Sequence, residues 1–184
     1  MIFRNKFDGL WGIEYRSKRP FPAIGGIVVE FLETRDQSGP FLWDKTQEIP
    51  IQVSAGDNYC SHYKGWVHRG HMIGNPFLTS PGYNQDGYMQ TKNNRVEALH
   101  VGVDGYITKE FDYRFLASLQ RGWGTPYIPF TKIQREFSGL IEVHYNPKTL
   151  QGWKFGLSIA ADTGSLFGNN WGIQLGIKKT GRLL

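Results

Sequence analysis

The stretch that decides the fold is residues 153–178, which read WKFGLSIAADTGSLFGNNWGIQLGIK. Apolar residues alternate there with polar or small ones in two runs, separated by a break rich in Gly and Asn. A period of two places successive side chains on opposite faces of a strand, whereas a helix needs a period of about 3.6. One predicted face carries Trp153, Phe155, Leu157, Trp171, Ile173 and Leu175, and the other carries Lys154, Ser158, Gln174 and Lys178. The stretch therefore predicts two neighbouring β-strands with one apolar and one polar face.

The same alternation recurs along the rest of the chain. In 111–120, for example, Phe111, Phe115 and Leu119 share one side, while Asp112 and Arg114 point to the other. The predicted strands are residues 11–16, 27–32, 98–103, 111–120, 137–145, 153–162 and 171–178. The sequence thus predicts an all-β chain, an antiparallel meander of about seven strands with few or no long helices.

Length, charge and cysteine content narrow the class of protein. The 184 residues fit a single domain, 1–184. No apolar run approaches the roughly 18 to 20 residues of a membrane-spanning helix. The net charge of +5 is scattered rather than gathered in a basic run, so nucleic acid is not expected as a partner. Cys60 is the only cysteine, which excludes an internal disulfide.

The pattern of connections favours a barrel in a membrane over a soluble sandwich. Residues 18–23, 104–110 and 146–151 form the short predicted turns, and residues 35–93, 121–136 and 163–170 form the longer connections. Short turns on the periplasmic side and long loops outside are typical of outer-membrane barrels, and large aromatic residues stand near the predicted strand ends, where such barrels have their girdles. We therefore expect the bacterial outer membrane, with outer-membrane lipid against the apolar face, the C-terminus periplasmic and the long loops extracellular.

The count and direction of the strands add a further expectation. Single-chain bacterial barrels have an even number of strands, whereas this sequence predicts about seven. Tracing the strands back from a periplasmic C-terminus places Met1 outside the cell, and residues 1–10 lack the apolar core of a signal peptide. We expect the chain to be the C-terminal portion of a larger outer-membrane β-barrel.

The segment 35–93 is the main candidate for a binding site, as a long extracellular or lumen-lining loop. Aromatic, amide and charged residues are interleaved in it. Aromatic rings can stack on sugar faces, while carboxylate, amide and guanidinium groups bind hydroxyls or acidic groups. The candidate carbohydrate-binding residues are Asp57, Asn58, Tyr59, Tyr63, Trp66, Arg69 and Asn75. The alternative is a loop that packs on its own aromatic residues.

Catalytic and metal sites are not expected. His68-Arg69-Gly70-His71 is similar to the core of ββα nucleases, but its first position is His instead of Asp, and residues 72–92 contain two prolines that exclude the required helix. His68 and His71 lack a further ligand at suitable spacing for a metal. His100, Glu142 and His144 lie on the predicted polar face, where a wet barrel interior carries such groups without catalysis. No cofactor motif is present.

Several stretches, in order along nearly the whole chain, resemble the capsule assembly Wzi family. They are residues 37–41 (QSGPF), 56–59 (GDNY), 65–70 (GWVHRG), 73–76 (IGNP), 93–96 (NNRV), 137–143 (FSGLIEV) and 162–170 (DTGSLFGNN). The resemblance implies an outer-membrane barrel with a periplasmic helical part that binds capsular or exopolysaccharide and assists its assembly or attachment at the cell surface, with no catalytic residues. The chain departs from the family in lacking the signal peptide, the helical part and the early strands.

Two other functions remain open at this point. A porin-like channel for ions or sugars would share the polar lumen but would conduct instead of retaining a polymer. A soluble β-sandwich lectin would share the alternation but would bury its apolar face in a core. The sequence does not decide which polysaccharide is bound.

Overall fold

The computed structural model describes residues 8–35, 67–68, 71–73, 75–79, 82–83, 86–87, 89–125 and 129–181. Every regular element in these ranges is a β-strand. The strands are β1 (Gly9–Arg16), β2 (Gly26–Glu33), β3 (Val67–His68), β4 (His71–Met72), β5 (Gly82–Tyr83), β6 (Met89–Gln90), β7 (Val96–Tyr106), β8 (Phe111–Gly124), β9 (Pro129–Tyr145), β10 (Trp153–Gly164) and β11 (Asn170–Lys179). The described part of the chain contains no helix long and apolar enough to cross a membrane.

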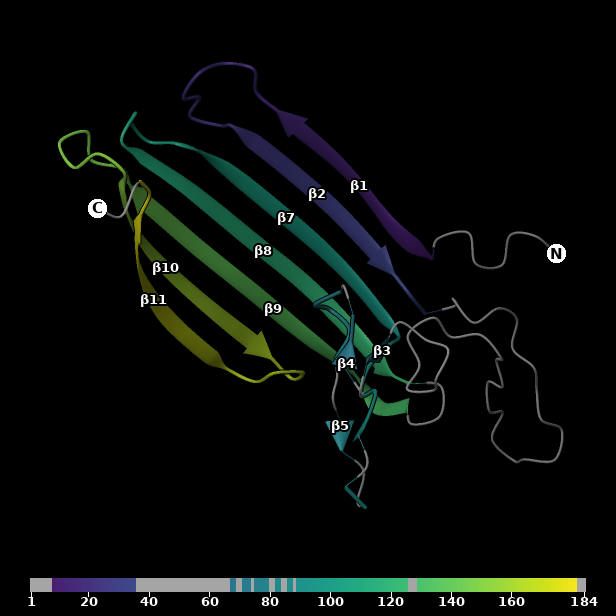
Figure 1. The fold of residues 1–184 in the computed structure, drawn as a ribbon. Helices are drawn as coiled ribbons and strands as arrows, with labels where there is room; N and C mark the ends of the chain where they lie inside the picture. Colours follow the sequence, from purple (N-terminus) through teal and green to yellow (C-terminus); the bar gives the residue numbers. More distant parts are fainter. Residues whose placement is uncertain are drawn as a thin grey trace, which may run out of the picture. The chain divides into compact units, whose positions relative to one another are not determined.

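Seven of these strands form one sheet, in the order β1-β2-β7-β8-β9-β10-β11 (Figure 1). Neighbours in the sheet follow one another along the chain except at the step from β2 to β7, where the segment 35–93 intervenes. The register of β10 is antiparallel on both sides, with Leu157 opposite Leu175 of β11 and Val143 of β9. The prediction of an all-β antiparallel meander of seven strands is confirmed.

The predicted strands are found in place, but several are longer than expected. The main difference is at β8 and β9, because β8 continues to Gly124 and β9 already begins at Pro129. The prediction that 121–136 is a long connection is therefore wrong. Residues 129–135 have exposed or partly buried side chains on both faces, so the apolar alternation that reveals a strand is missing there although the backbone pairing continues. Likewise, β10 runs to Gly164, which shortens the predicted connection 163–170.

The chain divides into two compact units. Unit 1 comprises Met1–Trp11, Phe31–Ala98 and Gln120–Arg135, and unit 2 comprises Gly12–Glu30, Leu99–Leu119 and Glu136–Leu184. The long strands pass from one unit into the other, so each unit holds one portion of them. Unit 1 contains the described parts of the segment 35–93, and unit 2 contains the short turns.

Unit 1 holds the buried apolar cluster of the described residues. Leu32 of β2, Val96 and Ala98 of β7, and Leu78 of the segment 35–93 are all at most 5% exposed and pack together. Met72 and Phe77 pack against the cluster. Gln120 Nε2 donates a hydrogen bond of 2.6 Å to the carbonyl oxygen of Phe77. Met72, Phe77 and Leu78 thus anchor the segment 35–93 on the sheet.

A clasp of hydrogen bonds joins the chain where this segment leaves and re-enters the sheet. Thr34 donates its backbone N–H to the Val96 carbonyl at 2.9 Å, and its Oγ1 accepts from the Val96 N–H at 2.9 Å. The same hydroxyl lies 2.9 Å from the Asn94 carbonyl oxygen. Thr34 is buried, so these bonds are shielded from water.

In unit 2, large apolar side chains on one side of the strands are exposed, and we call this side the apolar face. Its members include Ile13, Tyr15, Phe111, Phe115, Phe137, Ile141, Trp153, Leu157, Ile159, Trp171, Ile173, Leu175 and Ile177, with exposed fractions from 37% to 80%. Phe111, Tyr145, Phe155 and Trp153 form a stacked aromatic row across β8, β9 and β10, with ring centroids 4.6 to 6.4 Å apart. The predicted division of β10 and β11 into two faces is confirmed by the register.

Candidate functional site

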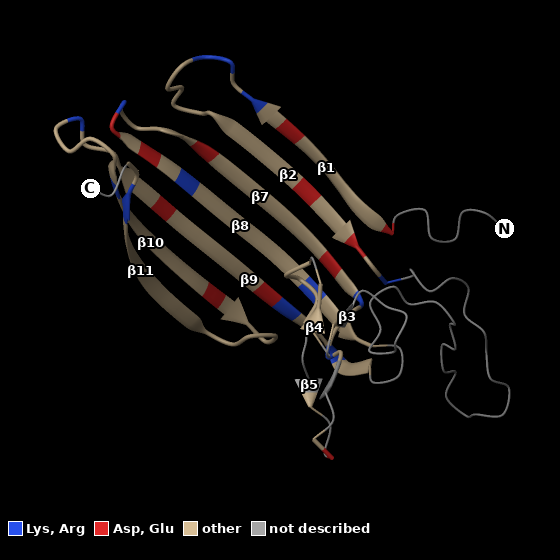
Figure 2. Ribbon diagram, in the orientation of Figure 1, with Lys and Arg blue, Asp and Glu red and all other residues tan. Residues whose placement is uncertain are grey.

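The opposite side of the strands in unit 2, which we call the polar face, gathers most of its ionisable groups. Its members include Asp112, Arg114, Glu142, His144, Lys154, Ser158, Gln174 and Lys178. They lie on this side because successive side chains of a strand point to opposite faces. The register of neighbouring strands determines which of them are adjacent. Ser158 stands between Glu142 of β9 and Gln174 of β11, and Lys154 stands opposite Lys178. Figure 2 shows charged residues within the strands themselves as well as in the turns.

Asp112 is the centre of one polar cluster. Its carboxylate oxygens lie 2.7 Å from His144 Nδ1, 2.8 Å from Asn146 Nδ2 and 3.1 Å from Lys154 Nζ. These partners come from the end of β9, the turn after it and the start of β10. Asp112 is partly buried, with 23% of its side chain exposed. Its negative charge is therefore stabilised by these hydrogen-bonding partners as well as by solvent. The cluster fixes the ends of three strands relative to one another.

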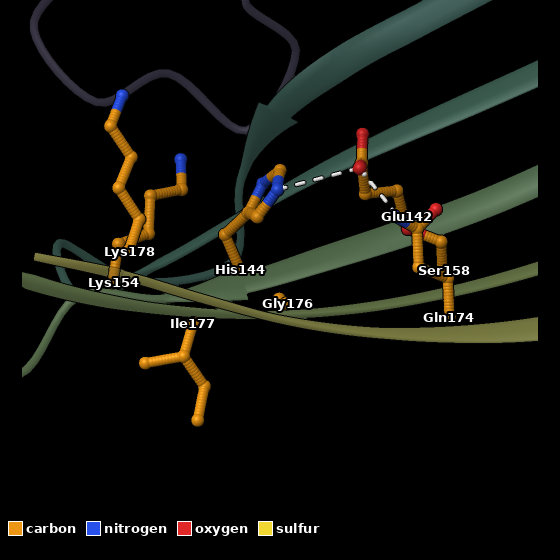
Figure 3. Close-up of a pocket in the computed structure, with 9 residues that line it drawn as sticks. Glu142, His144, Lys154, Ser158, Gln174, Gly176, Ile177 and Lys178 are labelled. Atoms are coloured by element: carbon orange, nitrogen blue, oxygen red, sulfur yellow. Dashed lines mark hydrogen bonds and ion pairs between the residues drawn. The ribbon is translucent and has the colours of Figure 1, made fainter.

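Glu142 is the centre of a second cluster that adjoins the first. Its Oε2 lies 2.6 Å from Arg114 Nη2, and its Oε1 accepts a hydrogen bond of 3.1 Å from Ser158 Oγ. His144 Nε2 is 3.5 Å from Glu142 Oε1 (Figure 3). Because His144 Nδ1 is bonded to Asp112, this imidazole connects the two carboxylates. One connected network of hydrogen bonds and ion pairs therefore joins seven residues of unit 2, namely Asp112, Arg114, Glu142, His144, Asn146, Lys154 and Ser158.

Beside this network lies a hollow of about 360 Å³. It is lined by Glu142, His144, Lys154, Gly156, Ser158, Gln174, Gly176, Ile177 and Lys178, from β9, β10 and β11. Gly156 and Gly176 are register partners and form its floor. A Cβ at Gly176 would meet nothing within 4 Å, so the space above this glycine is open. Figure 3 shows Lys154, Lys178 and His144 on one side of the sheet and Ile177 on the other.

Glu136, at the other end of unit 2's part of β9, orders the connection between β10 and β11. Its Oε2 accepts hydrogen bonds from the backbone N–H groups of Leu166 at 2.9 Å and Phe167 at 3.1 Å. Both Glu136 and Leu166 are buried. A buried carboxylate bonded to two backbone donors gives this connection a fixed conformation.

Of the seven carbohydrate-binding residues predicted from the sequence, Asp57, Asn58, Tyr59, Tyr63, Trp66 and Arg69 lie outside the described residues. Asn75 is described. Its Oδ1 accepts a hydrogen bond of 3.0 Å from the Phe77 N–H, and its carbonyl accepts from the Leu78 N–H. Its side chain therefore forms the turn that presents Phe77 and Leu78 to the buried cluster.

The histidines singled out in the sequence have separate positions. His68 and His71 are register partners in the hairpin β3–β4. His100 Nδ1 lies 2.8 Å from Ser118 Oγ on the polar face. Among the described residues, no group of three or more His, Cys, Asp or Glu side chains is placed to hold a metal ion. The described histidines therefore take part in pairing and hydrogen bonding within the sheet.

The sequence does not predict the hollow as a site. It predicts that the lining residues other than Ile177 share the polar face, but it indicates the segment 35–93 as the binding site. The signal that could have found it is the spacing of small residues, because Gly156 and Gly176 fall on the polar face of two neighbouring strands among long polar side chains.

Comparisons with protein-family models, curated proteins and solved structures found no match to this chain.

Proposed function

We propose that this chain forms part of an outer-membrane β-barrel that binds capsular or extracellular polysaccharide and assists its assembly or attachment at the cell surface. The observation that carries the membrane part of the proposal is the apolar face. Trp171, Ile173, Leu175 and Ile177 of β11 are each at least 58% exposed, on one side of one strand. Contiguous exposed apolar surface of this kind calls for a lipid or protein partner, since water solvates it poorly.

The contrast between the two faces supports lipid as that partner. In a soluble sandwich, the apolar face packs against a second sheet and the polar face meets water. Here the apolar face of unit 2 is exposed, while the opposite face carries the linked ionic network of Asp112, His144 and Glu142. An apolar exterior and a polar interior are the arrangement of a membrane barrel.

The anchoring of the segment 35–93 favours retention of a polymer over free conduction. Leu78 packs on Val96 and Ala98, which lie on the side of β7 opposite to the exposed Leu99. In the proposed barrel this is the interior side, so Met72, Phe77 and Leu78 occupy part of the lumen. A porin-like channel is the second candidate, and its conductance in a planar bilayer would distinguish it, because a polymer-binding barrel with an occupied lumen passes little current.

Tryptophan quenching tests contact with lipid. We expect brominated acyl chains to quench Trp171 strongly, because its side chain is 77% exposed on the apolar face. The measurement uses a variant in which every other tryptophan is replaced by phenylalanine, refolded into vesicles. The matched control moves the probe to the polar face by Gly172→Trp in a background that also carries Trp171→Phe. A Cβ at Gly172 meets nothing within 4 Å, so the site accepts a side chain. Equal quenching of the two probes would contradict a lipid-facing apolar face.

Polysaccharide retention is tested in the segment 35–93. Replacing Trp66 and Arg69 together by Ala in the protein at the cell surface is expected to release capsule into the medium, because the substitutions remove one predicted stacking surface and one predicted donor to an acidic group. The amount of folded barrel in the membrane is expected to stay unchanged, and it serves as the control. Capsule retention at the wild-type level would show that these two residues do not bind the polymer.

A further inference from the structure

The hollow on the polar face contains a cation whose counterion is not supplied by its neighbours. Lys154 and Lys178 are direct register partners, so two positive charges face each other across β10 and β11. Asp112 lies 3.1 Å from Lys154 Nζ, whereas among the described residues none forms an ion pair with Lys178. Like charges directly opposite each other in a sheet are unfavourable, and an anion between them would relieve the repulsion.

The other acidic group at the hollow does not neutralise Lys178. Glu142 is paired with Arg114 at 2.6 Å and accepts from Ser158 at 3.1 Å. His144 is bonded to Asp112 on one side and lies near Glu142 on the other. Counting the charges of Asp112, Arg114, Glu142, Lys154 and Lys178 leaves an excess of one positive charge, and it resides on Lys178.

The floor and walls of the hollow suit a ring with hydroxyl groups. Gly176 leaves a patch of open backbone, because a Cβ there would meet nothing within 4 Å, and one side of a sugar ring can lie on it. The His144 ring borders this patch, since its Cδ2 is 3.0 Å from the position of a Cβ at Gly156, the register partner of Gly176. Ser158 and Gln174 are register partners at the edge of this patch and carry hydroxyl and amide groups that can bond to sugar hydroxyls. The hollow of about 360 Å³ also lies in the size range of small-ligand sites.

We infer that this hollow is a subsite for an acidic sugar, with the carboxylate of a hexuronic acid residue bound by Lys178 and Lys154 and the sugar ring placed over Gly176, beside the imidazole of His144. The inference rests on the proposed polysaccharide binding and adds to it the chemical class of the polymer and a second contact area, on the strands. The two lysines favour a carboxylate, and the open backbone at Gly176 leaves room for the sugar ring.

The test compares two forms of one oligosaccharide. Tetragalacturonate and its full methyl ester have the same rings, but only the first carries carboxylates. Calorimetric titration of the full chain in detergent micelles is expected to show about tenfold tighter binding of the acid than of the ester, as for one charge-assisted contact. Lys178→Met is expected to abolish this preference. Lys179→Met removes the same charge from the other face, where Lys179 Nζ bonds to the Gln151 carbonyl, and is expected to keep the preference.

A second pair of variants tests the floor. Gly176→Leu fills the hollow, and Gly172→Leu adds the same side chain on the same face outside it; in neither case would the new Cβ meet an atom within 4 Å. We expect Gly176→Leu to weaken binding of both the acid and the ester, and Gly172→Leu to leave binding at the wild-type level. Equal loss in the two variants would overturn the subsite.

The outcomes separate this inference from the proposed function. Binding of acid and ester with equal affinity, or a preference that survives Lys178→Met, overturns the acidic subsite while saccharide binding stands. Binding of inorganic sulfate without binding of tetragalacturonate shows a small-anion site and likewise overturns the subsite. Absence of binding to any oligosaccharide or capsule overturns the proposed polysaccharide function and the subsite together, while the lipid contact of Trp171 is tested independently.

Discussion

Leu175→Arg is expected to destabilise the protein in a lipid bilayer by about 2–4 kcal/mol, the cost of an arginine side chain near the midplane on the lipid side of a barrel. Leu175 lies in the middle of β11 and is 80% exposed on the apolar face. The measurement is the urea dependence of reversible folding into phosphatidylcholine vesicles. The same substitution in water would change stability by no more than about 0.5 kcal/mol, because exposed surface positions tolerate polar residues.

The neighbouring residue provides the matched control for this experiment. Gln174 is next to Leu175 in β11 but lies on the polar face beside the hollow. Gln174→Arg adds the same side chain at the same depth and is expected to change the unfolding free energy in vesicles by less than about 1 kcal/mol. A similar effect of the two variants would mean that the apolar face does not meet hydrocarbon.

Gly152→Ala is expected to have the second large effect. Gly152, in the turn before β10, has a backbone φ of +79°, and a Cβ there would lie 2.1 Å from the Thr180 carbonyl oxygen. The left-handed conformation costs a residue with a side chain about 1–3 kcal/mol, and the overlap with a backbone atom adds about 1–3 kcal/mol. The unfolding free energy is therefore expected to fall by about 2–6 kcal/mol, measured by urea titration.

Two other glycines distinguish the cost of the left-handed backbone conformation from the cost of the overlap with Thr180. Gly168 has a similar φ of +81°, but a Cβ there would meet nothing within 4 Å, so Gly168→Ala reports the backbone conformation alone. Gly172 has neither feature, and Gly172→Ala is expected to leave stability almost unchanged. The expected order of destabilisation is Gly152, then Gly168, then Gly172. A Gly152→Ala variant as stable as the Gly172→Ala variant would contradict the close approach to Thr180.

The strands could be predicted from the sequence wherever one of their faces is apolar. The runs around Leu157 and Ile173 alternate without interruption, and the structure places them in β10 and β11 as expected. Residues 129–136 escaped prediction because hydrogen bonds to neighbouring strands hold them in β9, and such bonds leave little trace in the order of side chains. Alternation of apolar and polar residues reveals that one face of a strand avoids water. Backbone pairing depends instead on the neighbouring strand, which the local sequence does not show.

The candidate site was predictable only in part, for a related reason. Alternation alone assigned His144, Lys154 and Lys178 to one face. It did not reveal that Lys154 meets Asp112, which is 42 residues away, or that Gly156 stands opposite Gly176, because these contacts depend on the register of three strands. The hydrogen bond from the Phe77 N–H to Asn75 Oδ1 could not be predicted either, because residue type alone does not show that this amide also serves a turn.

The clasp between Thr34 and Val96 has a consequence for how such a protein can change in evolution. Thr34 and Val96 are 62 positions apart in the sequence, and the entropy lost on joining two points of a chain grows only with the logarithm of their separation. Doubling the segment would cost about 0.6 kcal/mol, no more than the contribution of about one hydrogen bond of the clasp. Insertions that leave the buried Leu78 and its neighbours Met72 and Phe77 in place are therefore nearly neutral for the sheet, so natural selection can lengthen the segment while the strands keep their register.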